Sequence, residues 1–305
     1  MKETIRMEPF RIAGIGEILW DIFPDGPRFG GAPSNFSCST AELALDAAKV
    51  FIASAVGNDP LGNKALTELQ EHRVNTVCVQ TNGRETGQVH VKLDQGGSAH
   101  YRFAEDSAWD DLLWDDSLAQ LAGQCNAVCF GTLGQRNPNS AKTILRFVDS
   151  VANEALKVLD VNLRYPYVSN AVIENSLSRA NVLKLNNDEL PRVASLIGAT
   201  GSELQMMKAL ATHFQLHTIA LTRGPQGAVI LSEDELSDLP GQSVEVVDTV
   251  GAGDAFTAAM TLGLLCRNPL KQINQGAIAA AAWACVNSGG TMTFPEHIRQ
   301  QVLDG

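Results

Sequence analysis

The residues best suited to chemistry lie in one stretch, Asp248 to Asp254 (DTVGAGD). Gly251 and Gly253 permit a tight turn, and the apolar pattern that starts at Ala252 predicts a helix. The first N–H groups of a helix lack partners and carry partial positive charge, so they can bind an anion. Asp254 would lie beside that anion site, as a base that takes a proton from a hydroxyl while the site holds phosphoryl charge. A helix-capping acid after a plain turn is the other interpretation.

A second glycine pair precedes another helix pattern near the start of the chain. Gly30 and Gly31 stand before a small-residue helix predicted from Ser34 to Leu45. Adjacent glycines let a ligand approach the backbone closely. A turn from loop to helix would use the same residues, so this stretch alone leaves both interpretations open.

The elements that must position these residues alternate between strand and helix along the chain. This alternation predicts an α/β fold with a doubly wound, mostly parallel sheet and helices on both faces. The expected strands are 10–19, 50–56, 127–130, 157–160, 182–185, 217–222 and 228–231, with strand-favouring residues again at 244–247. The expected helices are 34–45, one that ends at 71, 140–152, 172–179, 202–213, 252–266 and 270–287.

One region departs from this pattern. Apolar and polar residues alternate from 86 to 102, around a Gln-Gly-Gly-Ser turn at 95–98, which predicts a hairpin of half-exposed strands. Together, 17–32 and 86–106 would form a small β-sheet lid on a single domain that spans 1–305. In such a lid, Phe103 or Trp109 would either close over a substrate or pack its hinge. The edges of the lid sheet could pair with a second copy, giving a homodimer.

Composition limits the class of protein. The 305 residues are 45% hydrophobic and 19% charged, with a net charge of −11, which disfavours nucleic-acid surfaces and anionic membranes as partners. The apolar runs are shorter than the roughly 20 residues that a membrane span needs, and residues 1–9 do not form a signal peptide. Six cysteines without a C-x-x-C spacing are typical of the reducing cytoplasm.

Two motifs taken together resemble the signatures of the PfkB/ribokinase carbohydrate kinases. The first is GGAPSN at 30–35, followed by Gly57 and Gly62, and the second is DTVGAGD at 248–254. Between them lie DVNLR at 160–164, NNDE at 186–189 and TRGPQG at 222–227, so the resemblance runs from about 10 to 296. It implies a ribokinase-like fold and transfer of the γ-phosphoryl group of ATP to a sugar hydroxyl.

The resemblance also implies roles for individual residues. Asp254 would be the base, the backbone of Gly251, Ala252 and Gly253 the anion hole, and Arg164 a contact to phosphate or sugar. The residues that would bind sugar are Asp21, Gly30, Gly31, Asn35 and Phe103. The residues that would bind nucleotide are Asn186, Glu189, Thr222, Gly224 and Gly227.

Two ions follow from the same resemblance. Asn186 and Glu189 would arrange Mg²⁺ around the phosphates through water, which suits an ion that dehydrates reluctantly. Asp248 and the carbonyl of Val250 match a monovalent-cation site for K⁺, completed by the loop 287–290.

The substrate is less narrowly defined. The strings GEILWD (16–21), GGAP (30–33) and AWD (108–110) are closest to bacterial fructokinases, and the loop 131–136 lacks a glutamate that some ribose-specific members use. Fructose is therefore favoured. The alternatives are a 2-keto-3-deoxygluconate kinase, a ribokinase, a nucleoside kinase or a catalytically inactive sugar-binding module.

Two other enzyme classes are disfavoured by their missing motifs. The dinucleotide fingerprint G-x-G-x-x-G fails, because Gly14-Ile15-Gly16 is followed by Leu19 where the third glycine would stand. The chain also contains no G-x-x-x-x-G-K-[S/T] string, which argues against a P-loop nucleotide hydrolase.

Overall fold

A large, mostly parallel sheet forms the centre of the protein. We describe it from a computed structural model that defines residues 8–93, 99–233 and 235–304. Within these residues the strand order is β13-β12-β11-β10-β9-β8-β1-β4-β5, parallel from β5 to β11, with β12 and β13 antiparallel at one edge. The bounds are β1 (Phe10–Ile15), β4 (Ala48–Gly57), β5 (Val79–Asn82), β8 (Ala127–Phe130), β9 (Leu156–Asp160), β10 (Val182–Asn186), β11 (Thr218–Thr222), β12 (Ala228–Ser232) and β13 (Glu235–Leu239).

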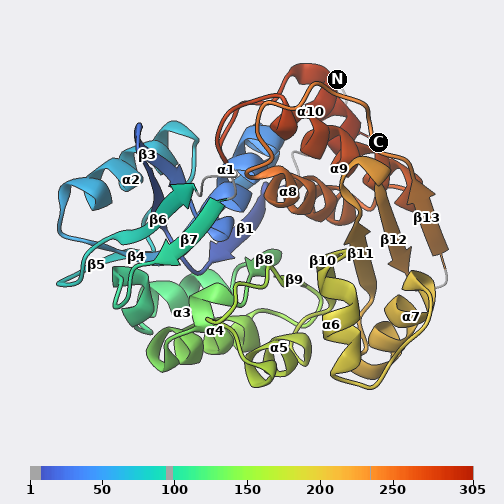
Figure 1. Cartoon of the computed structure of the whole chain (residues 1–305), viewed down its shortest axis with the longest axis horizontal. Helices are drawn as coiled ribbons and strands as arrows, with labels where there is room; N and C mark the ends of the chain where they lie inside the picture. The colour runs from blue at the N-terminus through green and yellow to red at the C-terminus, as the bar shows by residue number, and fades with distance from the viewer. Residues whose placement is uncertain (1–7, 94–98, 234, 305) are drawn as a thin grey trace, which may run out of the picture.

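Helices cover both faces of this sheet (Figure 1). Successive strand residues point to opposite faces, so Ile12 and Ala13 of β1 belong to two different apolar cores. The first core packs α1 (Ala32–Ala44), α2 (Pro60–Glu71), α8 (Ala252–Leu265), α9 (Leu270–Cys285) and α10 (Glu296–Leu303). The second packs α3 (Asp116–Ala122), α4 (Pro138–Ser150), α5 (Asn170–Leu177), α6 (Glu189–Ser195) and α7 (Glu203–Phe214). The short 3-10 helices are η1 (Leu45–Ala47), η2 (Ala108–Asp111), η3 (Leu133–Gln135) and η4 (Gly224–Gln226).

A separate small sheet has the strand order β3-β2-β6-β7. It comprises β2 (Leu19–Phe23), β3 (Gly26–Gly30), β6 (Gly87–Leu93) and β7 (Ala99–Phe103). The pairing of β6 with β7 is antiparallel, which confirms the hairpin predicted at 86–102, although its turn at 95–98 lies outside the described residues. The prediction of an α/β fold with a doubly wound sheet and an additional small sheet is therefore confirmed.

Two strand predictions were wrong. The run 10–19 is divided, because Gly16 has a φ of 148° and turns the chain from β1 in the large sheet to β2 in the small one. Residues 244–247 form no strand although three of them are valine. Val246 is 57% exposed and Val247 65% exposed, and no neighbouring strand supplies partners for their backbone groups, so strand propensity alone has nothing to pair with.

Among the described residues, no helix combines the length and the apolar composition that crossing a membrane requires.

Candidate active site

The predicted functional residues gather where the parallel strands end. Asp160, Asn186 and Thr222 are the last residues of β9, β10 and β11, three neighbouring strands. The helix α8 begins at the same edge, since Lys184 of β10 lies against its first turn. Ligands of open α/β sheets bind at the carboxyl ends of the strands, so this edge is the expected position of a site.

The start of α8 has the geometry of an anion site. Gly251 precedes the helix with a φ of 77°, a conformation that side chains rarely adopt, and a Cβ there would lie 2.7 Å from the Cα of Gly290. Gly253 lies in regular helix, but a Cβ there would lie 2.9 Å from the Nζ of Lys184. Both glycines therefore keep the N-terminal turn free of side chains, and its N–H groups stay accessible to an anion.

Asp254 lies in this first turn and has the properties of a base. Its Oδ2 accepts a hydrogen bond from Nδ2 of Asn35, at 2.8 Å. Burial and the negative charge of Asp160 raise the pKa of Asp254 to about 6, against the opposing effects of Asn35, Lys184 and Arg164. A carboxyl with such a pKa is charged at neutral pH and accepts a proton more readily than an exposed aspartate does.

A buried polar network supports the anion site from within the sheet. Nζ of Lys184 donates to Oδ1 of Asp160 at 3.2 Å, and Oγ1 of Thr257 donates to Oδ2 of Asp160 at 2.9 Å. Burial disfavours the charged form of Lys184, but the negative charges of Asp160 and Glu189 prevail and raise its pKa. The cation next to Gly253 is therefore permanently charged. The sequence motifs did not predict a role for Lys184, although a lysine among the apolar residues of a strand (VLKLN) is a detectable signal.

The predicted sugar-binding residues come from the small sheet and from α1, and Asn35 of α1 contacts Asp254 directly. Asp21 lies on β2, and a Cβ at Gly30 would lie 2.8 Å from its Oδ2. Gly31 has a φ of 101° and precedes α1, which carries Asn35 one turn later. Burial raises the pKa of Asp21 to about 6, against the positive charges of Arg164 and Arg28.

Arg164 faces the acidic groups from the loop after β9. The side chain is exposed, and its Nη1 donates to the carbonyl of Leu163 at 3.2 Å. Its positive charge opposes the rise in the pKa values of Glu17, Asp21 and Asp254, so the guanidinium is close enough to act on all three carboxyls.

The predicted nucleotide residues adjoin the anion site. Asn186 of β10 pairs in register with Thr222 of β11. The carboxylate of Glu189 accepts from the backbone N–H of Leu163 at 2.8 Å and of Asn186 at 2.9 Å, which fixes its position at the end of β10. Burial raises the pKa of Glu189, against the charge of Lys184.

The glycines of the TRGPQG loop differ in their surroundings. Gly224 is exposed, with a φ of 55° and open space where a Cβ would stand. Gly227 has a φ of 94°, and a Cβ there would lie 2.0 Å from the carbonyl oxygen of Leu239. Packing against the end of β13 thus already requires a glycine at 227, whereas Gly224 is free to face a ligand.

Asp248 joins the two loops that the sequence assigned to a cation site. Its Oδ1 accepts from the N–H of Val250 and its Oδ2 from the N–H of Gly289, both at 3.0 Å. The predicted proximity of 248–250 and 287–290 is therefore present in the structure.

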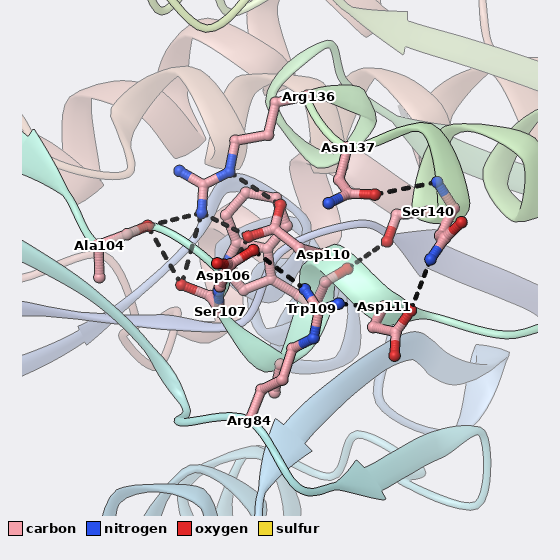
Figure 2. Close-up of polar contacts among 12 residues, drawn as sticks. Arg84, Ala104, Asp106, Ser107, Trp109, Asp110, Asp111, Arg136, Asn137 and Ser140 are labelled. Carbon is pink, nitrogen blue, oxygen red and sulfur yellow. Dashed lines mark hydrogen bonds and ion pairs between the residues drawn. The ribbon is translucent and has the colours of Figure 1, made fainter.

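A second charged cluster lies at the base of the small sheet (Figure 2). Nε of Arg136 donates to Oδ1 of Asp110 at 2.8 Å, and Nη2 donates to Oδ2 of Asp110 and to the carbonyl of Ala104, both at 2.6 Å. The guanidinium also lies 4.1 Å from the ring centroid of Trp109. Arg136 is therefore engaged in joining the end of the small sheet to the main domain.

Phe103 packs in the same region. It is 9% exposed, and its ring meets that of Tyr167 edge to face with centroids 5.1 Å apart. It shares a buried cluster with Leu19, Val89 and Trp109. This burial favours the hinge-packing interpretation of both aromatic residues, and a contact from Phe103 to substrate stays a prediction.

Comparison with known proteins agrees with this geometry. Residues 26–297 match the model of the pfkB family carbohydrate kinases. Over 289 residues the chain is 28% identical to a sugar kinase of Pyrococcus horikoshii, covering 88% of this chain and 87% of that protein. It is also 28% identical to a fructokinase of Klebsiella pneumoniae over 268 residues, covering 82% of this chain and 83% of the relative.

Solved structures share the fold. An Escherichia coli structure in complex with ATP and Mg²⁺ has a TM-score of 0.81 at 21% identity, covering 96% of this chain and 99% of the other. A Vibrio cholerae fructokinase variant with fructose, ADP and potassium ion has a TM-score of 0.79 at 21% identity, covering 98% and 100%. At these identities the likeness shows the fold alone. The family match over most of the length is more specific, and the chain belongs to the pfkB family of carbohydrate kinases.

Proposed function

We propose that this phosphotransferase transfers the γ-phosphoryl group of ATP to a neutral sugar, with fructose as the favoured acceptor. The observation that carries the proposal is the hydrogen bond between Asn35 and Asp254. It joins the predicted sugar-binding helix directly to the base, and that base stands in the first turn of the anion-binding helix. The same carboxylate is thus next to both reacting groups.

In the proposed mechanism, Asp254 takes the proton of the sugar hydroxyl as this oxygen attacks phosphorus. Asn35 keeps the carboxylate oriented during the transfer. The N–H groups at the start of α8 hold the charge that develops on the phosphoryl oxygens. Lys184 adds a buried positive charge next to this turn and is itself held by Asp160.

The nucleotide end suits ATP with Mg²⁺. Asn186 and Glu189 present oxygen atoms, which hard divalent cations prefer, and their positions are fixed by backbone hydrogen bonds. The raised pKa of Glu189 also fits a carboxylate that gains a cation when ligands bind. We assign these two residues to water-mediated contact with the ion, which when bound neutralises phosphate charge. Thr222, Gly224 and Gly227 would line the nucleotide.

A monovalent cation, K⁺, is proposed beside the anion site. The carboxylate of Asp248 is bound on both sides by N–H groups of the two loops that would surround the ion. Carbonyl oxygens such as that of Val250 suit a weakly hydrated cation. An ion there would stabilise the turn that leads into α8.

The charges of the site favour a neutral acceptor. Oδ1 of Asn35 is buried and, within the described residues, has no hydrogen-bond partner, so it is suited to a hydroxyl donor. A phosphorylated sugar would instead need cations. Arg136 is already paired with Asp110, which leaves Arg164 to face the carboxyls of Glu17, Asp21 and Asp254.

We further infer that the small sheet acts as a lid within one domain that spans 1–305. Asp21 lies on this sheet, whereas Asn35 and Asp254 lie on the main body, so movement of the sheet would open or complete the sugar site. Its edge strands β3 and β7 are the surfaces through which we propose that two copies form a homodimer.

The experiment that tests the function is a substrate panel at one ATP and Mg²⁺ concentration, run in potassium and in sodium buffer. We expect fructose to give the highest kcat/KM, above ribose, 2-keto-3-deoxygluconate, fructose 1-phosphate and adenosine. The rate should be higher in potassium buffer. A tenfold preference for another acceptor would contradict the fructose assignment. If no sugar of the panel supported ATP consumption, the inactive sugar-binding module would be favoured. Equal rates in both salts would contradict the K⁺ site.

The pH dependence should report the base. Because the pKa of Asp254 is raised to about 6, its charged, active form is lost as pH falls through that value. At saturating sugar, ATP and Mg²⁺, where binding no longer limits the rate, kcat should fall about tenfold per pH unit below pH 6. Initial rates from pH 4.5 to 8 measure this. An acid limb centred near pH 4, the range of an exposed aspartate, would show that a different step limits the reaction.

A further inference from the structure

Glu17 is a buried carboxyl for which the established chemistry of the site gives no role. It follows β1 at the carboxyl edge of the large sheet and is 3% exposed. Its Oε2 is buried and has no hydrogen-bond partner in the part of the chain that the structure describes, and a Cβ at Gly134 would lie 3.3 Å from this atom. A Cβ at Gly31 would lie 2.6 Å from the carbonyl oxygen of Glu17. The carboxyl of Glu17 therefore lies against η3, while its backbone lies against the loop of Gly31.

Burying such a group without a partner costs stability. An unsatisfied buried polar atom costs about 1–3 kcal/mol, and more when it is charged. Among the described residues, Glu17 has no ion pair within 4 Å. A shape-matched apolar side chain would be the more stable choice, so Glu17 resembles a group whose partner is a ligand.

The surroundings of Glu17 indicate which kind of ligand. The charged and titratable groups that face it are Asp254 on α8, Arg164 in the loop after β9 and the thiol of Cys129 on β8. Asp254 carries a negative charge, and the Cys129 thiol is neutral because burial raises its pKa, so a neutral hydroxyl donor fits this carboxyl better than an anionic group does. Oδ1 of Asn35, the other unpartnered oxygen near this loop, is also an acceptor. Two acceptors without donors suit a molecule rich in hydroxyls.

We propose that Glu17 is a specificity-determining residue of the sugar site, and that its carboxylate accepts a hydrogen bond from a hydroxyl of the bound neutral sugar. This proposal rests on the sugar-kinase function given above. It adds a third carboxyl to Asp21 and Asp254, and it assigns to Glu17 recognition of the sugar, with proton transfer left to Asp254.

Release of a proton from Glu17 on sugar binding would distinguish a role in recognition from a purely structural role. Burial raises the pKa of Glu17 to about 7, with the charge of Asp254 adding to the shift and Arg164 and the N–H groups of Glu17 and Ala32 opposing it. Glu17 is therefore partly protonated at neutral pH, where an exposed glutamate is fully charged. A hydroxyl that donates to the carboxylate favours its charged form, so sugar binding should release protons. Asp21 and Asp254, with pKa values of about 6, contribute less at this pH.

The experiment compares Glu17→Gln, Glu17→Met and the parent by calorimetric titration with fructose and each other neutral sugar of the panel. Titration at pH 7 in buffers of different ionisation enthalpy measures proton release. We expect Kd to rise at least tenfold in Glu17→Met and less in Glu17→Gln, with most of the proton release lost in both. The Tm should change little, because Oε2 has no hydrogen-bond partner among the described residues that either substitution would remove.

The matched control is Glu42→Gln, since Glu42 is 7% exposed on α1 and pairs with His72 away from the site. It should lower Tm and leave sugar affinity and proton release unchanged. A lower Tm with unchanged sugar affinity in both Glu17 variants would overturn the proposal, as would a parent that binds none of the sugars. A parent that binds sugar without phosphorylating it would contradict the kinase function alone, because the affinity comparison needs no turnover.

Discussion

Replacing Asp254 with asparagine should lower kcat by about 10²–10⁴-fold and change sugar affinity much less. Asparagine keeps the shape of the side chain and can still accept the hydrogen bond from Asn35, so binding geometry is preserved. It cannot take the hydroxyl proton. Steady-state kinetics on the best acceptor of the panel, with a separate measurement of sugar Kd, distinguishes loss of the base from loss of binding.

The control for this variant is Asp116→Asn. Asp116 is also an acid in the first turn of a helix, α3, but it is exposed. The Asp116→Asn variant shows how much of the change in kcat comes from removing an acid that interacts with a helix dipole, an interaction worth about 0.3–1 kcal/mol. Asp116→Asn should keep parental kcat. A kcat near that of the parent in Asp254→Asn would remove Asp254 from the role of base.

The second large effect is expected for Gly253→Val, which should fold and lose about 10²-fold or more in rate. Gly253 lies in regular helix, so the cost of a side chain comes from its surroundings. A Cβ would lie 2.9 Å from Nζ of Lys184, and that amino group is held by Asp160. The branched side chain would displace the cation and fill the space above the N–H groups that should hold the phosphoryl oxygens.

Two further variants make this test interpretable. Gly253→Ala adds only the Cβ, which the flexible end of the Lys184 side chain can accommodate by shifting. Its kcat should therefore fall less than that of Gly253→Val. Gly83→Val is the neutral control, because a Cβ there meets nothing within 4 Å. Parental kcat and Tm in Gly253→Val would show that this turn does not hold the transferred group.

Local sequence patterns were sufficient to predict those elements of the candidate site that a short stretch of chain forms by itself. The glycines and the acid of DTVGAGD predicted an anion-binding helix start, and α8 begins at Ala252 as expected. The two signatures also placed Asn35 and Asp254 in one site, although they are 219 residues apart. Their proximity follows from the fold that the resemblance implied, and no local pattern contains it.

Contacts set by the stacking of strands could not be predicted. Lys184 and Asp160 belong to neighbouring strands, and their pairing depends on the register of β9 against β10. Glu17 belongs to the GEILWD string at 16–21, but its burial depends on how η3 packs against the end of β1. The valines at 244–247 have high strand propensity but form no strand, because within the described residues no neighbouring strand pairs with them.

The proposed base Asp254 and the proposed sugar-binding acid Asp21 differ in how they are anchored. Asp254 lies in the first turn of a helix whose residues Ala255 to Gly263 are all buried, whereas Asp21 lies on a four-stranded sheet outside the central one. Amides of α8 beyond its first turn should therefore exchange with solvent only on global unfolding, and those of the small sheet through local opening as well. Catalysis and recognition are thus carried by parts of unequal local stability. Mutations that change the small sheet can alter which sugar is accepted without disturbing the machinery that phosphorylates it.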